Sequence, residues 1–302
     1  MSFTSPFPDV EIPNLSVYDF LFSTIEEADM DRVALVDPKS GDETSYARLI
    51  GQIQAAAGAL AARGIAVGDV VGVLSPNIPA FATVFHGILR AGGTATTINA
   101  LFTAPEIAKQ LTDSKAKMLV TVSPLFEQAA AAAKEVGIAD ENLIVLDGEG
   151  QKATGHPNAI DLLAPNLPAP EVSFDPATHV AVLPYSSGTT GNPKGVALSH
   201  RNLVANVAQI APLQGASPDD VVIAVLPFFH IYGMTVLLNA ALHNRSRLVT
   251  MPRFDLVEFL ENIQNFKVTH AYIAPPVAVA LAKHPIVDNY DPVSYTHLTL
   301  PT

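Results

Sequence analysis

Short apolar runs alternate with longer amphipathic or alanine-rich stretches along the first half of the chain. Runs of β-branched and aliphatic residues predict strands at 33–36, 70–74, 94–99, 118–122 and 143–146. The stretches between them predict helices at 55–62, 76–89, 104–111 and 123–133. Alternation of this kind with short connections is typical of a parallel sheet whose faces are covered by helices.

Residues that commonly begin and end helices punctuate this pattern. Thr103 and Glu106 have the spacing of a capping box. Gly64 and Gly137 follow alanine-rich stretches at positions where a glycine often stops a helix. These signals support the helices predicted from periodicity.

A second alternating series follows a proline-rich linker, which has four prolines between Ala164 and Pro176. Its predicted strands are 180–184, 196–198, 221–225, 248–251 and 271–274, and its predicted helices are 200–208, 234–242, 256–263 and 277–283. We therefore expect an α/β fold of two doubly wound subdomains, with largely parallel sheets flanked by helices. The expected boundaries are 1–172 for the first subdomain and 173–291 for the second.

Composition and charge narrow the class of protein. The 302 residues are 49% hydrophobic, which is enough for one large core or two smaller ones. The net charge of −12 argues against nucleic acid or an anionic membrane as the main partner, because both attract basic surfaces. The sequence has no run of eighteen apolar residues that would predict a membrane span, and no cysteine for a disulfide, a thiolate metal site or a nucleophile. A cytoplasmic protein is expected.

A polar loop after the predicted strand 180–184 carries the densest chemistry in the chain. Within eleven residues it holds four aliphatic hydroxyls, three glycines and one lysine, namely Ser186, Ser187, Gly188, Thr189, Thr190, Gly191, Lys194 and Gly195. Glycine amides can approach an anion closely, hydroxyls donate further hydrogen bonds, and the lysine adds a mobile charge. The loop is therefore interpreted as a polyphosphate-binding segment.

Two other interpretations of this loop are weaker. A Walker A loop of a kinase or NTPase needs Gly-Lys-Ser/Thr with a helix starting at once, whereas here Lys194 precedes Gly195 and a short predicted strand. The helix is expected only after Ser199, a suitable N-cap. A flexible connector would explain the glycines but not the lysine or the hydroxyls. A noncatalytic nucleotide-binding or interaction module stays open as a third alternative.

The run YSSGTTGNPKGVALSHRNL, residues 185–203, resembles the phosphate-binding signature of the adenylate-forming superfamily. This superfamily contains acyl- and aryl-CoA synthetases, beetle luciferases and adenylation domains. Within it, the chain is most similar to the 4-coumarate–CoA ligase and acyl-CoA synthetase branch, from about Phe7 to about Asp291. The resemblance implies that 1–172 and 173–291 are two subdomains of one AMP-binding domain.

The resemblance also implies a reaction. A carboxylic acid joins the α-phosphate of ATP, pyrophosphate leaves, and the acyl group passes to the thiol of CoA. Residues 186–191 and Lys194 would hold the β- and γ-phosphates, with Mg²⁺ bridging phosphate oxygens and Lys194 acting catalytically. ATP, Mg²⁺ and CoA are thus the implied cofactors, and fatty acid or phenylpropanoid metabolism is the implied setting.

Further site residues follow the predicted strand 221–225. His230 matches the family histidine that borders the carboxylate and the adenylate, so it is expected to be both catalytic and substrate-binding. Tyr232 matches a position that contacts an aromatic acyl group. Val236 matches a second wall position that is small and polar in the plant enzymes, so its apolar side chain argues against a hydroxycinnamate. Arg253 matches a cationic position that contacts CoA.

The same region argues against an amino acid as substrate. Adenylation domains place an acidic residue here to pair with the substrate's amino group, but the sequence has no Asp or Glu between Pro227 and Arg245. A buried unpaired ammonium group would be costly. The expected substrate is a small-molecule carboxylic acid without an α-amine, either aryl or fatty acyl.

Residues 292–302 depart from the family pattern. The run Val293–Leu298 is similar to the translation of a common sequencing-adapter end, so this stretch is expected to be a non-native tail and His297 is not assigned a role. The family's adenine-binding motifs and a C-terminal domain with a catalytic lysine would follow Asp291. We therefore expect an N-terminal fragment that does not turn over on its own.

Overall fold

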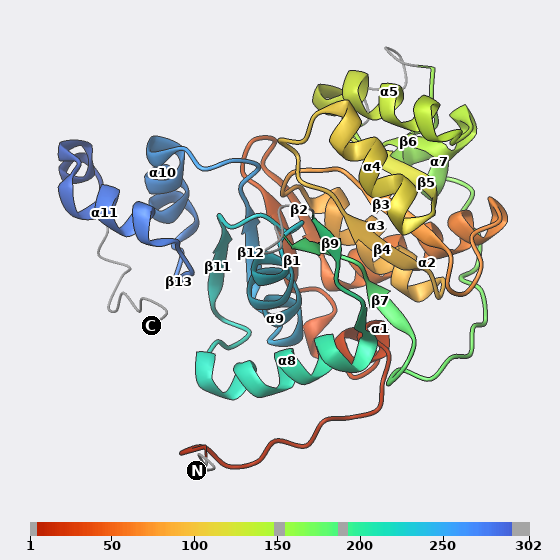
Figure 1. Ribbon diagram of the computed structural model, residues 1–302. Coiled ribbons are helices and arrows are strands. Elements are labelled where there is room, and N and C mark those ends of the chain that lie inside the picture. The colour runs from red at the N-terminus through yellow and green to blue at the C-terminus, as the bar shows by residue number, and fades with distance from the viewer. Residues whose placement is uncertain (1–4, 148–154, 187–192, 292–302) are drawn as a thin grey trace, which may run out of the picture.

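The computed structural model describes residues 5–147, 155–186 and 193–291 (Figure 1). Its α-helices are α1 (Val17–Phe22), α2 (Tyr46–Ala62), α3 (Pro79–Arg90), α4 (Ala104–Ser114), α5 (Phe126–Val136), α7 (Ala159–Leu163), α8 (His200–Gln214), α9 (Ala240–His243), α10 (Leu256–Phe266) and α11 (Pro275–Lys283). The shorter helical turns are η1 (Glu27–Asp29), η2 (Ser123–Leu125), η3 (Asp140–Asn142) and η5 (Pro285–Asn289), and η4 (Gly233–Asn239) is a π-helix.

Two sheets and a hairpin hold the strands of the described residues. The first sheet has the order β10 (Leu198–Ser199), β7 (Val180–Val182), β4 (Thr94–Thr97), β3 (Val70–Val73), β5 (Ala116–Thr121), β6 (Leu143–Val145). The second has the order β13 (His270–Ala271), β11 (Val221–Ala224), β12 (Arg247–Thr250), β1 (Val33–Asp37), β2 (Asp42–Ser45). The hairpin consists of β8 (Tyr185–Ser186) and β9 (Lys194–Gly195). Only the β7–β10 and β1–β2 pairs within the two sheets are antiparallel, which confirms the expected α/β class with largely parallel sheets.

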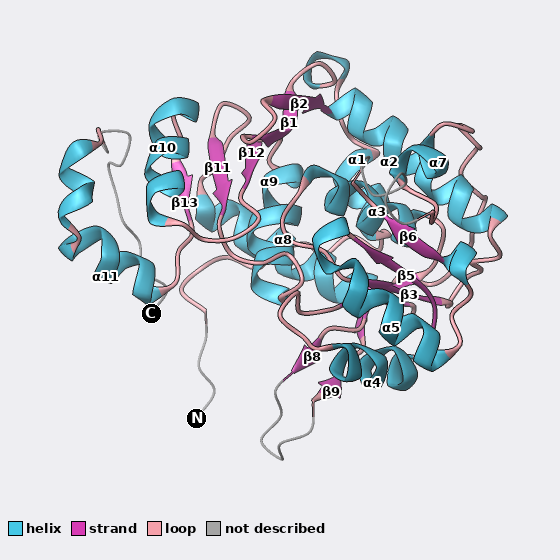
Figure 2. Ribbon diagram, turned by 90° about the horizontal axis from the view of Figure 1, so that it is seen from above, coloured by secondary structure: helices cyan, strands magenta, loops and turns pink. Residues whose placement is uncertain are grey.

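The helices form three layers around the two sheets (Figures 1 and 2). Helix α3 contacts β3 and β4 of the first sheet and β1 of the second, so it lies between the sheets together with α2. Helices α4 and α5 cover the outer face of the first sheet, and α10 covers the outer face of the second. The segments that leave the strands therefore emerge from sheets that are buried on both faces.

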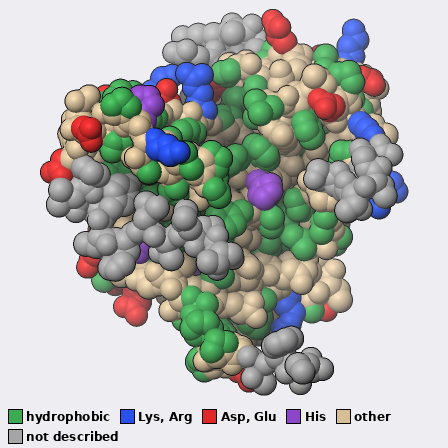
Figure 3. Space-filling model, turned by 60° about the vertical axis from the view of Figure 1, so that its left-hand side comes forward, with side chains coloured by type: hydrophobic (Ala, Val, Ile, Leu, Met, Phe, Trp, Pro, Cys, Tyr) green, Lys and Arg blue, Asp and Glu red, His purple; other side chains and the backbone are tan. Residues whose placement is uncertain are grey.

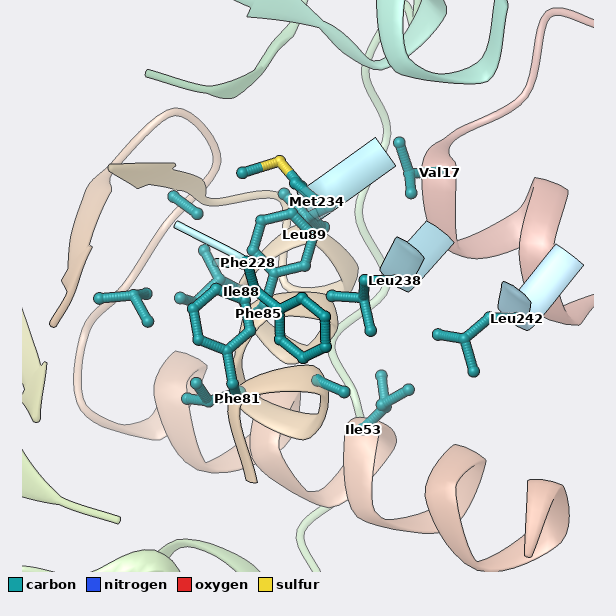
Figure 4. Close-up of a cluster of buried hydrophobic side chains, with 14 of the residues drawn as sticks. Val17, Ile53, Phe81, Phe85, Ile88, Leu89, Phe228, Met234, Leu238 and Leu242 are labelled. Carbon is teal, nitrogen blue, oxygen red and sulfur yellow. The ribbon is translucent and has the colours of Figure 1, made fainter. Parts of the chain in front are cut away.

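The central layer is a continuous hydrophobic cluster (Figure 4). Phe81 and Phe85 of α3 stack with ring centroids 5.8 Å apart. Phe81 also packs against Phe228, which follows β11 of the second sheet, at 5.4 Å between centroids. Because both rings are fully buried, this contact fixes the loop after β11 against α3.

The expected boundary at residue 172 does not separate the two sheets. Val36 in β1 pairs with Val249 in β12, so the first segment of the chain contributes strands to the second sheet. Likewise, Val182 in β7 pairs with Ala95 in β4 of the first sheet. Alternation of strands and helices reveals the elements, but strand partners are decided by packing between remote segments, which this pattern does not encode.

Most predicted elements form close to their expected places. The backbone N–H of Thr103 donates to Glu106 Oε2 at 2.8 Å, as the capping box requires, and Gly137 ends α5 in the left-handed conformation. Helix α8 begins after the predicted N-cap Ser199, and it extends past 208 to Gln214. Helix α1, helix α7 and strand β2 were not predicted.

Two predicted elements differ in kind. The stretch 196–198 does not form one strand, because Val196 and Ala197 connect β9 to β10. The helix predicted at 234–242 begins as the π-helix η4 and continues as α9. None of the helices in the described part of the chain is long and apolar enough to cross a membrane.

Candidate functional site

The predicted phosphate segment begins and ends in the hairpin β8–β9, which extends from the body of the molecule (Figure 2). Ser186 is paired with Lys194 across the hairpin, and both residues are exposed. The hairpin thus places the hydroxyl of Ser186, at the end of β8, beside the ammonium group of Lys194, at the start of β9. The other predicted phosphate-binding residues, Ser187, Gly188, Thr189, Thr190 and Gly191, lie outside the described residues.

Tyr185 fastens the hairpin to α4. Its hydroxyl donates to the carboxylate of Asp113, and burial, followed by this hydrogen bond and the negative charge, raises the pKa of Tyr185 above its usual range. A Cβ on Gly195 would lie 3.2 Å from Cζ of the tyrosine ring, so the glycine leaves room for the ring across the hairpin. The backbone N–H of Val196 donates to the carbonyl of Pro184 at 2.8 Å and closes the base of the hairpin.

A second segment leaves β11 and carries His230 in a tight turn. The His230 N–H donates to the carbonyl of Pro227 at 3.1 Å. The backbone N–H of Tyr232 donates to His230 Nδ1 at 3.3 Å. An Nδ1 that accepts leaves the proton of the neutral imidazole on Nε2. The exposed ring can therefore offer an N–H donor to a ligand.

This turn depends on Gly233. A Cβ on this residue would lie 2.1 Å from the carbonyl oxygen of Pro227, which no side chain can accommodate without moving the backbone. Gly233 also starts the π-helix η4, in which Val236 is half-buried. Single turns of π-helix often occur at functional sites, because the wider turn changes where side chains point.

Two half-buried tyrosines, Tyr232 and Tyr272, lie in the segments that follow β11 and β13. Tyr232 is half-buried at the start of η4, and burial raises its pKa. Tyr272 follows β13, and burial, together with the charges of Tyr232 and Asp220, raises its pKa to about 12. Both phenols stay neutral at physiological pH and can donate hydrogen bonds. Hydrophobic side chains also gather around a histidine on the face drawn in Figure 3.

The first sheet anchors the second segment through buried polar side chains. Asn77, which follows β3, donates from Nδ2 to the carbonyls of Ala224 and Leu226 at 2.8 and 2.9 Å. Thr97 at the end of β4 donates from Oγ1 to the carbonyl of Phe229 at 2.7 Å. The sequence interpretation missed both residues, although polar side chains at the carboxyl ends of buried strands were the available signal.

Arg253 lies in the exposed connection between β12 and α10. Strands β11 and β12 are parallel neighbours, so Arg253 and the segment of His230 leave the same edge of the second sheet. Asp255 caps α10 by accepting from the N–H groups of Val257 and Glu258, both at 3.0 Å. The contact of Arg253 with CoA stays a prediction.

Acidic and imidazole side chains do not form a metal centre in the described part of the chain. Among residues 5–147, 155–186 and 193–291, no three His, Asp or Glu side chains gather closely enough to hold a metal ion.

These features define an α/β protein with an exposed, lysine-bearing hairpin attached to α4 and a histidine-bearing turn anchored to β4. A family model described as AMP-binding enzyme matches residues 22–299. The chain therefore belongs to the AMP-binding enzyme family, and the resemblance to adenylate-forming enzymes is confirmed.

Relatives with known names agree with this family. The chain is 36% identical to 4-coumarate–CoA ligase 5 of Oryza sativa subsp. japonica, over 96% of this chain and 53% of the relative. It is 35% identical to probable 4-coumarate–CoA ligase 1 of Dictyostelium discoideum, over 96% of this chain and 55% of the relative. The chain thus spans about half the length of these relatives.

Solved structures agree as well. ATP-bound MatB from Rhodopseudomonas palustris superposes with a TM-score of 0.78 at 28% identity, over 90% of this chain and 52% of that one. A long-chain-fatty-acid–CoA ligase from Archaeoglobus fulgidus superposes with a TM-score of 0.82 at 26% identity, over 92% of this chain and 55% of that one. The described fold is therefore the fold of the matching half of these enzymes.

Proposed function

We propose that this chain is the ATP- and carboxylate-binding portion of a carboxylate–CoA ligase. In the proposed reaction a carboxylate oxygen attacks the α-phosphorus of ATP, and the bond to pyrophosphate breaks. The CoA thiolate then attacks the acyl carbonyl of the acyl adenylate, and AMP leaves. Family membership and the named relatives support this reaction class.

One observation carries the proposal: both candidate segments are tied to the end of the same strand. The N–H of Leu183, two residues before the hairpin, donates to the carbonyl of Ala95 in β4 at 2.9 Å. Thr97, two residues further along β4, is bonded to the residue that precedes His230. A polyphosphate held by one segment and a carboxylate held by the other would therefore start close together, which is what attack on an α-phosphate needs.

Each predicted site residue has a role in this proposal. Ser186 and Lys194 hold the β- and γ-phosphates, and Lys194 neutralises charge that develops on the leaving pyrophosphate. His230 donates from Nε2 to an oxygen of the carboxylate or the adenylate, while Tyr232 and Val236 line the acyl group. Mg²⁺ enters bound to the phosphate oxygens of ATP and offsets their charge. Arg253 contacts CoA.

The substrate class follows from the same residues. The stretch between Pro227 and Arg245 has no acidic residue to pair with an amino group, and Val236 offers no hydrogen bond. We propose a carboxylic acid without an α-amine, either an aryl or a fatty acid. A cytoplasmic setting fits the absence of cysteine.

The alternative of a P-loop kinase or NTPase receives no support from the local structure. Lys194 lies in β9, and α8 begins only at His200, after a further strand. In a Walker A loop the helix would begin directly at the lysine. A noncatalytic nucleotide-binding module is an outcome of the experiments below.

Calorimetric titration with Mg·ATP tests nucleotide binding by the 302-residue chain. We expect weak binding that Lys194→Ala reduces at least tenfold, because a charge-assisted hydrogen bond is worth about 1.5–3 kcal/mol. Lys134→Ala removes a lysine from α5, outside the candidate site, and should leave binding unchanged. Equal effects of both substitutions would contradict the assignment of the hairpin.

ATP–pyrophosphate exchange with a panel of aryl and fatty acids tests turnover. We expect no exchange from this chain, because it spans 53% of the length of the ligase from Oryza sativa subsp. japonica, and the resemblance places a catalytic lysine beyond Asp291. A fusion that appends the C-terminal part of that relative after Asp291 should show exchange. Robust exchange by the 302-residue chain alone would refute the predicted inactivity.

A further inference from the structure

A buried polar network links α4, the end of β4 and the two candidate segments. Gln110 on α4 is 3% exposed. Its Nε2 donates to Thr96 Oγ1 at 2.9 Å and to the carbonyl of Thr97 at 3.0 Å. Both N–H bonds of the amide are therefore used within β4.

Thr96 and Thr97 extend this hydrogen-bond network to two different segments of the chain. Consecutive residues of a strand point to opposite faces of the sheet. Thr96 Oγ1 donates to the carbonyl of Leu183, just after β7, at 2.8 Å. Thr97 Oγ1 donates to the carbonyl of Phe229, just before His230, at 2.7 Å. Two adjacent side chains thus hold the starts of both segments.

Burial alone does not explain why positions 96 and 97 carry threonine and not valine. All four residues of β4 are buried, and Thr96 has no exposed surface. Valine has the same shape, suits a strand equally well and buries no hydroxyl. A hydroxyl removed from water is costly unless it is hydrogen-bonded. Each hydroxyl here is bonded to the backbone of a different remote segment, so the threonines specify where those segments lie.

Gln110 determines the direction of the Thr96 bond. The Thr96 oxygen accepts from Gln110 Nε2, so its own proton is free to point at Leu183. Asp113, one turn along α4, receives the hydroxyl of Tyr185. Helix α4 therefore contacts the hairpin directly through Asp113, and Gln110 links it to Leu183 through Thr96.

We propose that Gln110, Thr96 and Thr97 are positioning residues that set the spacing between the phosphate segment and the segment of His230. The proposal rests on the proposed function of these two segments. None of the three side chains is assigned a contact with substrate. They act through main-chain carbonyls, and their loss separates or loosens the two halves of the site.

Three isosteric variants on one strand test the proposal. Thr96→Val and Thr97→Val each replace one hydroxyl by a methyl group. Thr94→Val is the matched control, because Thr94 Oγ1 donates to the carbonyl of Val180 at 2.7 Å, at the start of β7, rather than to Leu183 or Phe229. Val180 is paired with Ser199 in β10, so we expect any local effect of this control at residues 198–199. All three hydroxyls are buried and bonded to a carbonyl, so a general loss of stability should be similar in the three variants.

Hydrogen–deuterium exchange of the 302-residue chain gives a local readout. Thr97→Val should speed exchange of peptides covering 226–236 about tenfold, as expected for the loss of one buried hydrogen bond, and leave 193–199 unchanged. Thr96→Val should speed exchange of peptides covering 193–199 and leave 226–236 unchanged. Gln110→Leu should loosen 193–199. Thr94→Val should loosen neither 226–236 nor residues 193–197, because its partner Val180 is paired with Ser199 and not with the hairpin. Uniform exchange changes in all the variants would overturn the proposal.

Thr97→Ser keeps the hydroxyl and should retain the exchange pattern of the unaltered chain even if Thr97→Val fails to fold. If the serine variant folds and still loosens 226–236, the hydroxyl is not the positioning group and the proposal fails. Exchange needs no ligand, so this result is independent of the proposed function.

Binding experiments connect the positions to the site. The probes are Mg·ATP and a non-hydrolysable acyl sulfamoyl adenosine. Thr96→Val should weaken both probes severalfold, whereas Thr97→Val should weaken the acyl probe more than ATP. If the unaltered chain binds neither probe, the proposed function fails while the exchange pattern still decides the positioning role. Binding that is the same in the two variants and in Thr94→Val would contradict the proposal.

Discussion

Asn77 Oδ1 accepts a hydrogen bond from the backbone N–H of Phe228 at 2.7 Å, although 151 residues separate them in sequence. The donor half of the same amide binds the carbonyls of Ala224 and Leu226. One side chain after β3 of the first sheet thereby satisfies three main-chain groups at the end of β11 and in the loop that follows it. The loop that leads to His230 is held in place by this bridge between the sheets.

Replacing Asn77 by leucine should destabilise the fold strongly. Leucine has a similar size but leaves two carbonyls and one N–H unpaired in a buried place, because Asn77 is only 2% exposed. Each unsatisfied buried group costs about 1–3 kcal/mol, so we expect a loss of about 3–5 kcal/mol after partial relaxation. Urea unfolding followed by circular dichroism measures it. Asn265→Ala, at an exposed position on α10, should change stability by less than about 0.5 kcal/mol.

Substitution by alanine should have opposite effects on stability at Gly233 and at Gly51. A Cβ at Gly233 would meet the Pro227 carbonyl oxygen at 2.1 Å, whereas a Cβ at Gly51, on the exposed face of α2, would meet nothing within 4 Å. Gly233→Ala should therefore destabilise the chain and displace the turn of His230. Gly51→Ala should stabilise it by about 0.5–1 kcal/mol, because glycine is a poor helix former. Thermal unfolding of both variants checks the opposite signs.

Because His86 is buried, we expect the chain to lose stability at mildly acidic pH. Its Nδ1 lies 2.8 Å from the carbonyl of Ala82, and the Asn239 amide lies 3.0 Å from Nε2. Complete burial lowers the pKa of His86 from 6.5 to about 4. The unfolded chain therefore binds the proton more readily between these values, and stability falls as pH drops from 6.5 towards 4. The contribution of this residue reaches about 3 kcal/mol at the lower end.

The measurement compares the unaltered chain with His86→Gln in urea at several pH values between 7.5 and 4.5. Glutamine can hydrogen-bond but does not titrate, so its stability should fall less steeply below pH 6.5. His200 contributes in the same direction, because burial lowers its pKa to about 3, and it remains in both proteins. Parallel pH profiles would show that His86 does not titrate as stated.

Local signals in the sequence predicted most of the elements but not how they pair. The capping box at Thr103 and the N-cap at Ser199 were readable because capping depends on residues three positions apart. The pairing of Val36 with Val249 was not readable, because it depends on which remote faces bury each other. The sequence predicted a helix over 234–242, but nothing in it indicated a π-helical start at Gly233, where an added Cβ would lie 2.1 Å from the carbonyl oxygen of Pro227.

The candidate site shows the same difference between local signals and contacts that are remote in sequence. Ser186, Lys194, His230 and Tyr232 were predicted as site residues because they belong to motifs in which several unusual residues lie close together in sequence. Their supporting residues lie apart in sequence and are single polar side chains among apolar ones. Gln110 within α4 gives no local signal, because glutamine is an ordinary helix residue. Only the tertiary structure brings it to β4.

Tyr185 and Asp113 give a last prediction that separates anchoring of the hairpin from its charge. Tyr185→Phe removes the hydroxyl that binds Asp113, so Ser186 and Lys194 lose one of the contacts that hold them near α4. We expect ATP affinity to fall severalfold, with stability changed by less than about 1 kcal/mol because the pair is partly exposed.

Asp113→Asn keeps an acceptor and removes a negative charge near a site for phosphate, so its ATP affinity should equal or exceed that of the unaltered chain. Calorimetric titration measures both. Unchanged affinity in Tyr185→Phe would mean that the hairpin does not need this anchor, and weaker binding in Asp113→Asn would mean that the carboxylate acts on the ligand in another way.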